Sequence, residues 1–317
     1  MIRFLVRRVA QLVLTALVLV LATFVVLRLT PGGPAQALLG ADRYTPALEA
    51  ALNERLGLDR SIGEQLGRWG LAVLRGDLGD SYFFRRPAVD VVRERLLATL
   101  VLGGVAFAAA VVAGIPLGVW AAACGGSRLD RVLSRVAVTL VSVPSFWLGI
   151  GLILVFSAWL GWLPSSGLAP AGRAGTWAER TQHLILPLLT TMASHVGILA
   201  LYTRAAVAET LAADFTRTAR TIGASEWRVV WRHALPPAAV PIVTMAGLTL
   251  AHFLEGSLVV ETIFAWPGIG QLTVASVAHR DYPVLLALTL CAGVAVVLAT
   301  SLADLAAAWL DPRVPRS

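Results

Sequence analysis

Long apolar runs separated by polar segments dominate the chain. The six runs fall at 9–27, 98–122, 133–159, 184–204, 236–262 and 283–309. Each approaches or exceeds the ~20 residues that an α-helix needs to cross the hydrocarbon core of a bilayer. The pattern therefore predicts an all-α, polytopic membrane protein with six transmembrane helices.

Composition agrees with a membrane protein. Of the 317 residues, 57% are hydrophobic and only 14% are charged, and the mean hydropathy is +0.75. Soluble domains rarely reach this balance. The formal charge of +7 comes from arginine alone, because the chain contains no lysine. Cys124 and Cys291 lie in or beside apolar runs, which argues against a structural disulfide or a thiolate metal site.

The arginines are distributed unevenly between the two sides of the predicted bundle. One side receives both termini, the short loop after 122 and the long segment 204–236. Outside that long segment, its arginines are Arg3, Arg7, Arg8, Arg128, Arg131, Arg135, Arg313 and Arg316. By the positive-inside rule this side is the cytoplasm. The segments 30–97, 160–183 and 263–282 are then expected outside, and the arginine excess reports topology rather than nucleic-acid binding.

This topology divides the chain into four parts. They are a cytoplasmic N-terminus with the first helix (1–29), an extracytoplasmic segment (30–97), a transmembrane core (98–310) and a cytoplasmic tail (311–317). No small-residue cleavage site follows the first apolar run, so we expect an uncleaved span rather than a signal peptide. The spacing of Leu and Trp within 30–97 predicts short amphipathic helices on the rim of the bundle.

One polar interruption also shows helical periodicity. Within 204–236, Leu211, Phe215, Ala219 and Ile222 recur at spacings of three and four, which places them on one face of a predicted helix. Gly223 is expected to stop that helix, because glycine enters the left-handed region without steric cost.

A second short helix is predicted after this glycine. Ser225 would cap it and Leu235-Pro236 would end it. The residues predicted to form a single stripe along it are Trp227, Val230, Trp231 and Ala234. Two short helices at an angle would form a compact knob, although periodicity alone fits an interfacial helix lying flat on lipid headgroups equally well.

The spacing in this segment resembles the coupling (EAA) loop of ABC-importer permeases. In that loop E-A-A, a glycine and a final Leu-Pro stand at fixed offsets. Here Gly223 and Leu235-Pro236 occupy those places, and Arg217-Thr218-Ala219 stands where E-A-A is expected. The flanking R-T-A-R and R-H-A-L resemble the peptide/nickel branch of the family. The resemblance implies docking on an ATPase subunit by Phe215, Arg217, Thr218, Ala219, Arg220, Gly223, Ala224, Leu235 and Pro236.

The same branch is similar to this chain over almost its whole length. The matching motifs are LGLD at 56–59, GDLG at 76–79, SVPSFWLG at 142–149, ETIFAWPGIG at 261–270 and RDYP at 280–283. The chain departs from the branch at Gly33, where Asp is usual, and at Leu97, where Pro is usual. The fold implied is a type I ABC-importer permease with six transmembrane helices.

The resemblance implies one permease subunit of an ATP-driven importer in the inner membrane of a bacterium. The implied partners are a second similar permease, two ATPase subunits that bind ATP and Mg, an extracytoplasmic substrate-binding protein and membrane lipid, without nucleic acid. The chain itself is expected to bind no cofactor or metal and to catalyse no reaction. Its implied cargo is di- or oligopeptides, and nickel or a nickel chelate is an alternative that these motifs do not separate.

No catalytic motif is present in the sequence. G-x-x-x-x-G-K-[ST], H-E-x-x-H and G-x-S-x-G are all missing. The five histidines are scattered over different segments, which argues against a dedicated metal site.

Ionisable residues inside the predicted spans are the remaining candidates. His252 and Glu255 stand on one face of the fifth span, and with Ser257 they form a candidate substrate path. Glu255 lies about midway between Pro241 and Pro267, which predicts a place near the bilayer midplane. A charge there costs roughly 2.5–3.5 kcal/mol, so it is expected to face water or a partner.

Alternatives remain for each of these residues. Glu255 also fits a contact with the second permease, and His195 in the fourth span also fits a neutral ring bonded to a neighbouring helix. A rival class is an ion-gradient transporter with His252, Glu255 and Asp304 as a proton relay. It is disfavoured because the two halves show no repeat and such a carrier needs no docking knob.

Overall fold

The computed structural model describes residues 2–30, 33–39, 45–170 and 172–310, and the regular secondary structure in these ranges is helical. One isolated β-bridge joins Asp80 to Pro87. The long helices are α1 (Ile2–Leu29), α5 (Ala88–Ala123), α8 (Trp177–Leu211), α11 (Leu235–Leu254) and α14 (Tyr282–Leu310). The predictions for the tail 311–317 and for the side chains of Arg3 and Arg7 lie outside the described residues.

Shorter helices complete the chain. Before the third long helix these are α2 (Pro34–Leu39), α3 (Pro46–Leu56), α4 (Ile62–Leu74), α6 (Arg128–Ser142) and α7 (Ser145–Leu152). After it come α9 (Asp214–Thr221), α10 (Glu226–Arg228), α12 (Leu258–Ile263) and α13 (Ile269–Ala278). Two π-helical segments, η2 (Ile153–Trp159) and η3 (Val229–Ala234), continue α7 and α10 respectively.

The described residues contain five helical stretches long and apolar enough to cross a membrane, and up to six if the bent pair α6 and α7–η2 counts as one. The predicted all-α, polytopic fold is therefore confirmed. The pair is bent by 95°, and Val143 before Pro144 has extended backbone angles. The bend follows from proline, which disfavours helical angles in the residue before it.

Close helix packing organises the bundle around α5 and α8. At Gly118 of α5, a Cβ atom would lie 2.5 Å from the carbonyl oxygen of Ala200 in α8. At Gly114, one turn earlier, it would lie 2.9 Å from the carbonyl oxygen of Val196. Two glycines four residues apart thus allow the two backbones to approach closely, as small residues do between membrane helices.

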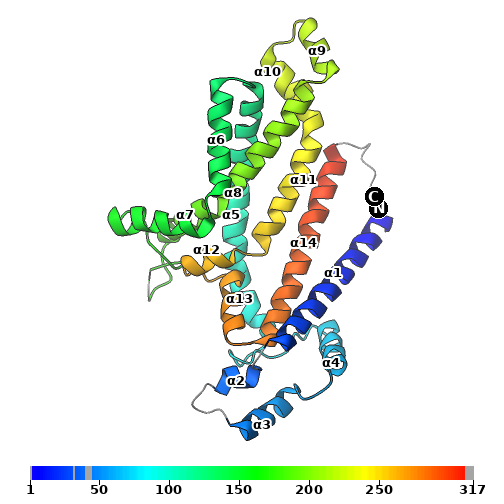
Figure 1. Ribbon diagram of the computed structural model, residues 1–317, viewed down its shortest axis with the longest axis vertical. Coiled ribbons are helices and arrows are strands. Elements are labelled where there is room, and N and C mark those ends of the chain that lie inside the picture. Colours follow the sequence, from blue (N-terminus) through cyan, green and yellow to red (C-terminus); the bar gives the residue numbers. More distant parts are fainter. Residues whose placement is uncertain (1, 31–32, 40–44, 171, 311–317) are drawn as a thin grey trace.

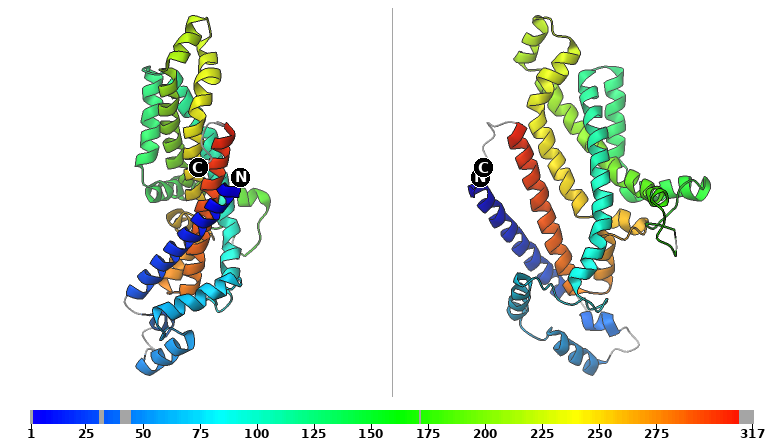
Figure 2. Two further views of the ribbon diagram at one scale, coloured as in Figure 1. Left: turned by 90° about the vertical axis from the view of Figure 1, so that its right-hand side faces the viewer. Right: turned by 180° about the vertical axis from the view of Figure 1, so that it is seen from behind.

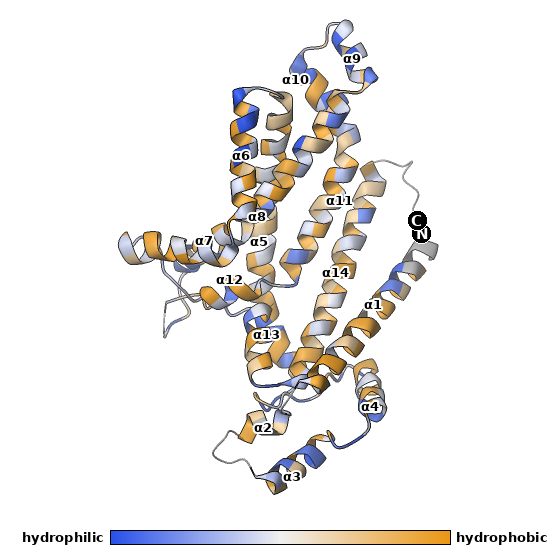
Figure 3. Cartoon of the chain, viewed as in Figure 1, coloured by the Kyte–Doolittle hydropathy of each residue, from blue (hydrophilic) through white to orange (hydrophobic). Residues whose placement is uncertain are grey.

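The two ends of the molecule differ in character. Figure 1 shows α9 and α10 beyond one end of the bundle and α2, α3 and α4 at the opposite end, and the turned views of Figure 2 keep this separation. Figure 3 shows hydrophilic residues gathered on α9 and α3 and hydrophobic residues along the helices between them. The start of α1 and the end of α14 lie together, joined by an ion pair between Arg8 and Asp304.

A buried carboxylate fastens the outer segment to the bundle. Asp281, immediately before α14, is fully buried. It accepts hydrogen bonds from the backbone N–H groups of Tyr82 at 3.0 Å and Phe83 at 3.3 Å, and from the hydroxyl of Ser81. The RDYP motif therefore has a structural role here, because its carboxylate is satisfied by the loop that precedes α5.

Candidate functional site

The segment 204–236 forms a projecting knob whose helices begin and end differently from the prediction. Helix α8 continues to Leu211, α9 follows after a two-residue break, and α10 runs through η3 directly into α11 (Figure 1). The prediction that Leu235-Pro236 ends a helix is wrong. The preceding η3 is a π-helical turn, and such a turn can accommodate the local disruption of bonding that proline brings.

The four residues predicted to share one face of the first helix do not do so. Leu211 ends α8, Ala219 is only 4% exposed, and Phe215 and Ile222 are 47% and 79% exposed. The break between α8 and α9 resets the helical phase, so spacings counted across it lose their meaning. Ala219 packs inside the knob, and the docking contact predicted for it needs correction.

The residues of the stripe predicted for the second helix also lie on two different faces, one buried and one exposed. Val230 and Ala234 are buried, whereas Trp227 and Trp231 are exposed, with ring centroids 5.3 Å apart. Ser225 stands at the N-cap position but makes no side-chain capping bond. The buried face packs on α5 and α8, and the tryptophans are left on the surface.

Internal hydrogen bonds hold the knob together. Arg220 donates from Nε to Glu226 Oε1 at 2.9 Å and from Nη1 to the carbonyl oxygen of Leu211 at 3.3 Å. The buried Thr216 donates its hydroxyl to the carbonyl oxygen of Ala213 at 2.7 Å. Gly223 follows the C-cap residue of α9 and has φ +88°, which confirms the predicted stop. Arg220 thus acts inside the knob.

The exposed side of the knob is apolar at four positions. We call Phe215, Ile222, Trp227 and Trp231 the knob tip, since each side chain is exposed. The spacing predicts one face for Ile222 and the buried Ala219, and one stripe for the two tryptophans and the buried Val230, so the sequence does not separate these exposed residues from the buried ones. The remaining sequence-assigned coupling residues lie nearby: Arg217, Thr218 and Pro236 are exposed, and Ala224 and Leu235 are half-buried.

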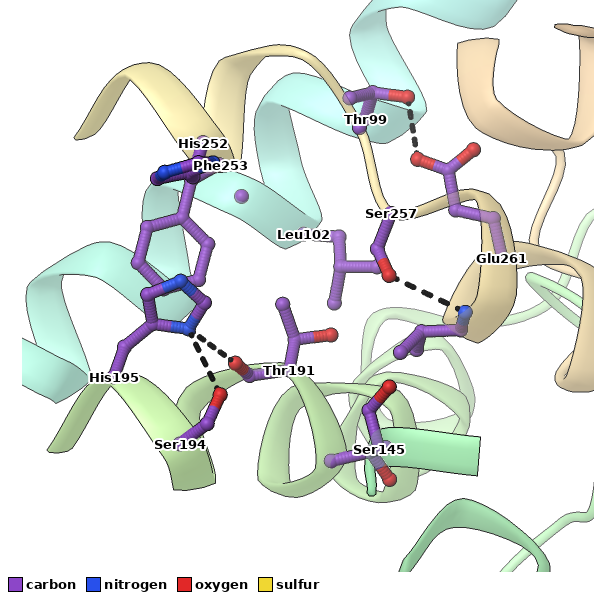
Figure 4. Close-up of a pocket in the computed structure, with 14 residues that line it drawn as sticks. Thr99, Leu102, Ser145, Thr191, Ser194, His195, His252, Phe253, Ser257 and Glu261 are labelled. Carbon is purple, nitrogen blue, oxygen red and sulfur yellow. Dashed lines mark hydrogen bonds between the residues drawn. The ribbon is translucent and has the colours of Figure 1, made fainter. Parts of the chain in front are cut away.

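A partly open pocket of about 210 Å³ lies where α11 ends and α12 begins (Figure 4). Five helices contribute to it: α5, α7, α8, α11 and α12. Its lining residues are Thr99, Leu102, Gly103, Ser145, Thr190, Thr191, Ser194, His195, His252, Phe253, Gly256, Ser257, Val260 and Glu261. Two members of the predicted substrate path, His252 and Ser257, are among them.

Glu255 does not line this pocket. Helix α11 ends at Leu254, and the residues 255–257 link it to α12 with Gly256 at φ +80°. The predicted depth of Glu255 assumed one unbroken helix, so that argument is wrong. Glu255 is exposed beside the pocket. Asp304, the third member of the suggested proton relay, instead pairs with Arg8 of α1.

His195 is hydrogen-bonded within its own helix rather than to a neighbouring helix, and it also lines the pocket. Its Nδ1 lies 3.0 Å from the carbonyl oxygen of Thr191 in the same helix, so the ring is locally hydrogen-bonded. The ring also forms part of the pocket wall, with its centroid 4.3 Å from that of Phe253 and 6.4 Å from that of His252. Figure 4 shows His195, Ser194 and Thr191 on one wall, opposite Ser257 and Glu261.

A buried acid that the sequence analysis did not weigh forms the opposite wall. Glu261 is fully buried, and it accepts from the Thr99 hydroxyl at 2.8 Å and from the backbone N–H of Gln271 at 3.0 Å. The Thr99 oxygen in turn accepts from the N–H of Ile269 at 2.8 Å. The carboxylate and hydroxyl thereby satisfy the free N–H groups at the start of α13. Its position within the ETIFAWPGIG motif was the available signal.

Comparison with known proteins defines the class. Residues 114–316 match the model of the binding-protein-dependent transport system inner membrane component, and residues 1–103 match the N-terminal model of the same systems. The chain belongs to this family. It is a multi-pass inner-membrane permease of the ABC-importer type, and a permease of this family is not itself an enzyme.

Individual relatives are similar over nearly the full length. The probable D,D-dipeptide transport system permease protein DdpB of Escherichia coli (strain K12) is 37% identical, covering 93% of this chain and 92% of its own. The glutathione transport system permease protein GsiC of Salmonella paratyphi A is 37% identical, with 99% of each chain covered.

A solved structure supports the fold. The inward-facing MetNI methionine ABC transporter matches with a TM-score of 0.54 at 19% identity, covering 70% of this chain and 97% of the matched chain.

Proposed function

We propose that the chain is one of two permease subunits of an ATP-driven importer that carries di- or oligopeptides into the cytoplasm. A second permease would complete the path, two ATPase subunits would bind ATP and Mg, and an extracytoplasmic binding protein would deliver cargo to the side of α2–α4. The knob would dock on one ATPase subunit. ATP-driven closure of the ATPases would then shift the permease pair between inward-open and outward-open packings.

The observation that carries this proposal is the knob tip. Phe215, Ile222, Trp227 and Trp231 present exposed apolar side chains at the end of the molecule away from α2–α4 (Figure 1). Clustered exposed apolar residues, tryptophan above all, are typical of docking surfaces. The knob projects beyond the bundle rather than lying across it, which favours docking over a helix lying flat on lipid (Figure 2).

The relatives favour peptides as the cargo. Two permeases that are 37% identical to this chain are named for dipeptide and glutathione transport. Nickel therefore becomes the second candidate. The ion-gradient alternative is dropped, because the family consists of binding-protein-dependent systems.

The test is uptake by the complete importer reconstituted in proteoliposomes. With the cognate second permease, ATPases and binding protein present, ATP inside the vesicles should drive uptake of labelled alanyl-alanine, and a proton gradient alone should not. Nickel uptake without peptide uptake would contradict the peptide proposal. Uptake driven by the gradient without ATP would contradict the importer mechanism.

A further inference from the structure

The wall of the pocket between α11 and α12 contains threonine hydroxyls that form hydrogen bonds within their own helix. Two threonines of its wall have already used their protons: Thr190 donates to the carbonyl oxygen of Leu186 at 2.9 Å, and Thr191 donates to that of Pro187 at 2.8 Å. A hydroxyl has one proton and two acceptor lone pairs. What these two residues can still offer a ligand is therefore acceptor oxygen.

His195 adds a further acceptor. Its Nδ1 faces the carbonyl oxygen of Thr191 at 3.0 Å, and a carbonyl oxygen can only accept, so Nδ1 carries the proton of the neutral ring. The other ring nitrogen, Nε2, is then left with its lone pair. Figure 4 shows this nitrogen on the side of His252 and Phe253, away from the bonded side of the ring.

The charged group in the wall is already satisfied. Glu261 accepts from Thr99 and from the backbone of Gln271, so its carboxylate serves the start of α13. Among the lining residues that the structure describes there is no arginine, and the chain has no lysine. An anionic group placed here would lose its hydration without gaining a cationic partner, which is costly. A group that donates hydrogen bonds would instead find several acceptors.

We infer that this pocket is a cargo subsite for a protonated primary amine, such as the amino terminus of a peptide, held by Thr191, Thr190 and His195. The inference rests on the proposed function of the bundle as a cargo path. An ammonium group has three donors and no acceptor, which matches acceptor oxygens and a ring nitrogen. The cavity of about 210 Å³ leaves room for one end of a peptide.

The test measures binding to the permease–ATPase complex in nanodiscs without the binding protein, whose own selectivity would otherwise contribute. The probes are labelled alanyl-alanine and lactoyl-alanine, which replaces the ammonium group by a hydroxyl of similar size. The wild-type complex should bind alanyl-alanine at least about tenfold more tightly, because hydrogen bonds to a charged group are the strong ones.

Substitutions of Thr191 test whether this residue contributes to the preference for the ammonium group. Thr191→Val should weaken alanyl-alanine binding about tenfold and leave lactoyl-alanine nearly unchanged, and Thr191→Ser should restore the wild-type value. Thr203→Val is the matched control, because Thr203 is buried in the same helix, does not line the pocket and has no hydrogen-bond partner for its hydroxyl.

Three results overturn the subsite. They are equal affinity of the wild-type complex for both probes, equal loss for both probes in Thr191→Val, and no binding of alanyl-alanine to a complex that transports it when the binding protein is present. Failure of the complete importer to transport any peptide is a different result, since it removes the proposed function first. Gel filtration of each variant complex confirms that assembly is intact before binding is measured.

Discussion

The knob has buried residues that hold its helices together and exposed residues that are available to a partner. Ala219 and Ile222 are three residues apart, and their spacing predicts a shared helix face. Ala219 is nevertheless 4% exposed, whereas Ile222 is 79% exposed. Ala219 lies within α9, which packs on η3, whereas Ile222 follows the end of that helix. A docking surface must consist of the exposed residues, so Ile222 and Trp227 replace Ala219 as the side chains expected to contact an ATPase.

Trp227→Ser is therefore expected to weaken docking of the ATPase. Buried interface tryptophans often cost about 2 kcal/mol or more on truncation, which corresponds to roughly a thirtyfold loss in affinity. Affinity of the purified ATPase for the permease pair in nanodiscs measures this. Arg228→Ser, an exposed polar neighbour, should change affinity little. If both variants bind as the wild type does, the knob tip is not the docking surface.

Substitutions of Gly223 test whether the geometry of the knob is needed to couple ATP hydrolysis to transport. Its φ is +88°, and nothing lies within 4 Å of an added Cβ, so a substitution meets backbone strain rather than a clash. Gly223→Val should cost about 1–2 kcal/mol and uncouple ATP hydrolysis from transport while the chain still inserts. Gly223→Asn, which tolerates the left-handed region, should retain most of the activity. Wild-type transport and ATPase stimulation in the valine variant would contradict the role.

At the scale of helices, an ion pair between a buried carboxylate and a half-exposed arginine connects α6 to α8, the helix that leads into the knob. Asp130 accepts from Arg204 Nε at 2.5 Å and Nη2 at 2.8 Å, and from the backbone N–H of Gly126 at 3.0 Å. The side chain of Asp130 is 4% exposed. The pair thus fixes α6 to α8 close to the knob.

Breaking the pair should destabilise the bundle. Arg204→Gln leaves the buried carboxylate of Asp130 without its cation and should cost about 1–3 kcal/mol, seen as a lower unfolding temperature in detergent. The double variant Asp130→Asn with Arg204→Gln should lose less than the sum of the two single variants. Arg131→Gln, exposed on the same helix, is the control. Additive losses would show that the pair does not act as a unit.

The long apolar elements were predictable from the sequence, and the interruptions within them were less so. Apolar residues continue across 236–262, so periodicity did not reveal that α11 stops at Leu254. The break coincides with Gly256, which packs against α13: an added Cβ would lie 3.0 Å from Ile269 Cγ1. The pocket was missed for the same reason, because Thr99, Thr191 and Glu261 come together only in the packed structure. Gly223, a local stop, was predicted correctly.

At the scale of the whole molecule, the two ends suit different partners. The α2–α4 end is held to the bundle through Asp281, whereas the knob stands at the other end. Helix α5 alone has 36 residues, which at ~1.5 Å each gives about 54 Å, well beyond the ~30 Å hydrocarbon core.

The orientation of these ends is the last prediction. Arginine placement predicts that the knob lies in the cytoplasm and α3 outside, and ATP is available to a docked ATPase only on the cytoplasmic side.

Cysteine labelling at one exposed position on each end tests this orientation: Glu54 in α3 and Thr218 in α9. In a parent with Cys124→Ser and Cys291→Ser, a membrane-impermeant maleimide should label Glu54→Cys in intact spheroplasts. Thr218→Cys should react only after the membrane is permeabilised. The unmodified parent controls for background, and immunoblotting confirms equal insertion. Labelling of Thr218→Cys from outside, with Glu54→Cys protected, would invert the topology and remove the knob from any ATP-binding partner.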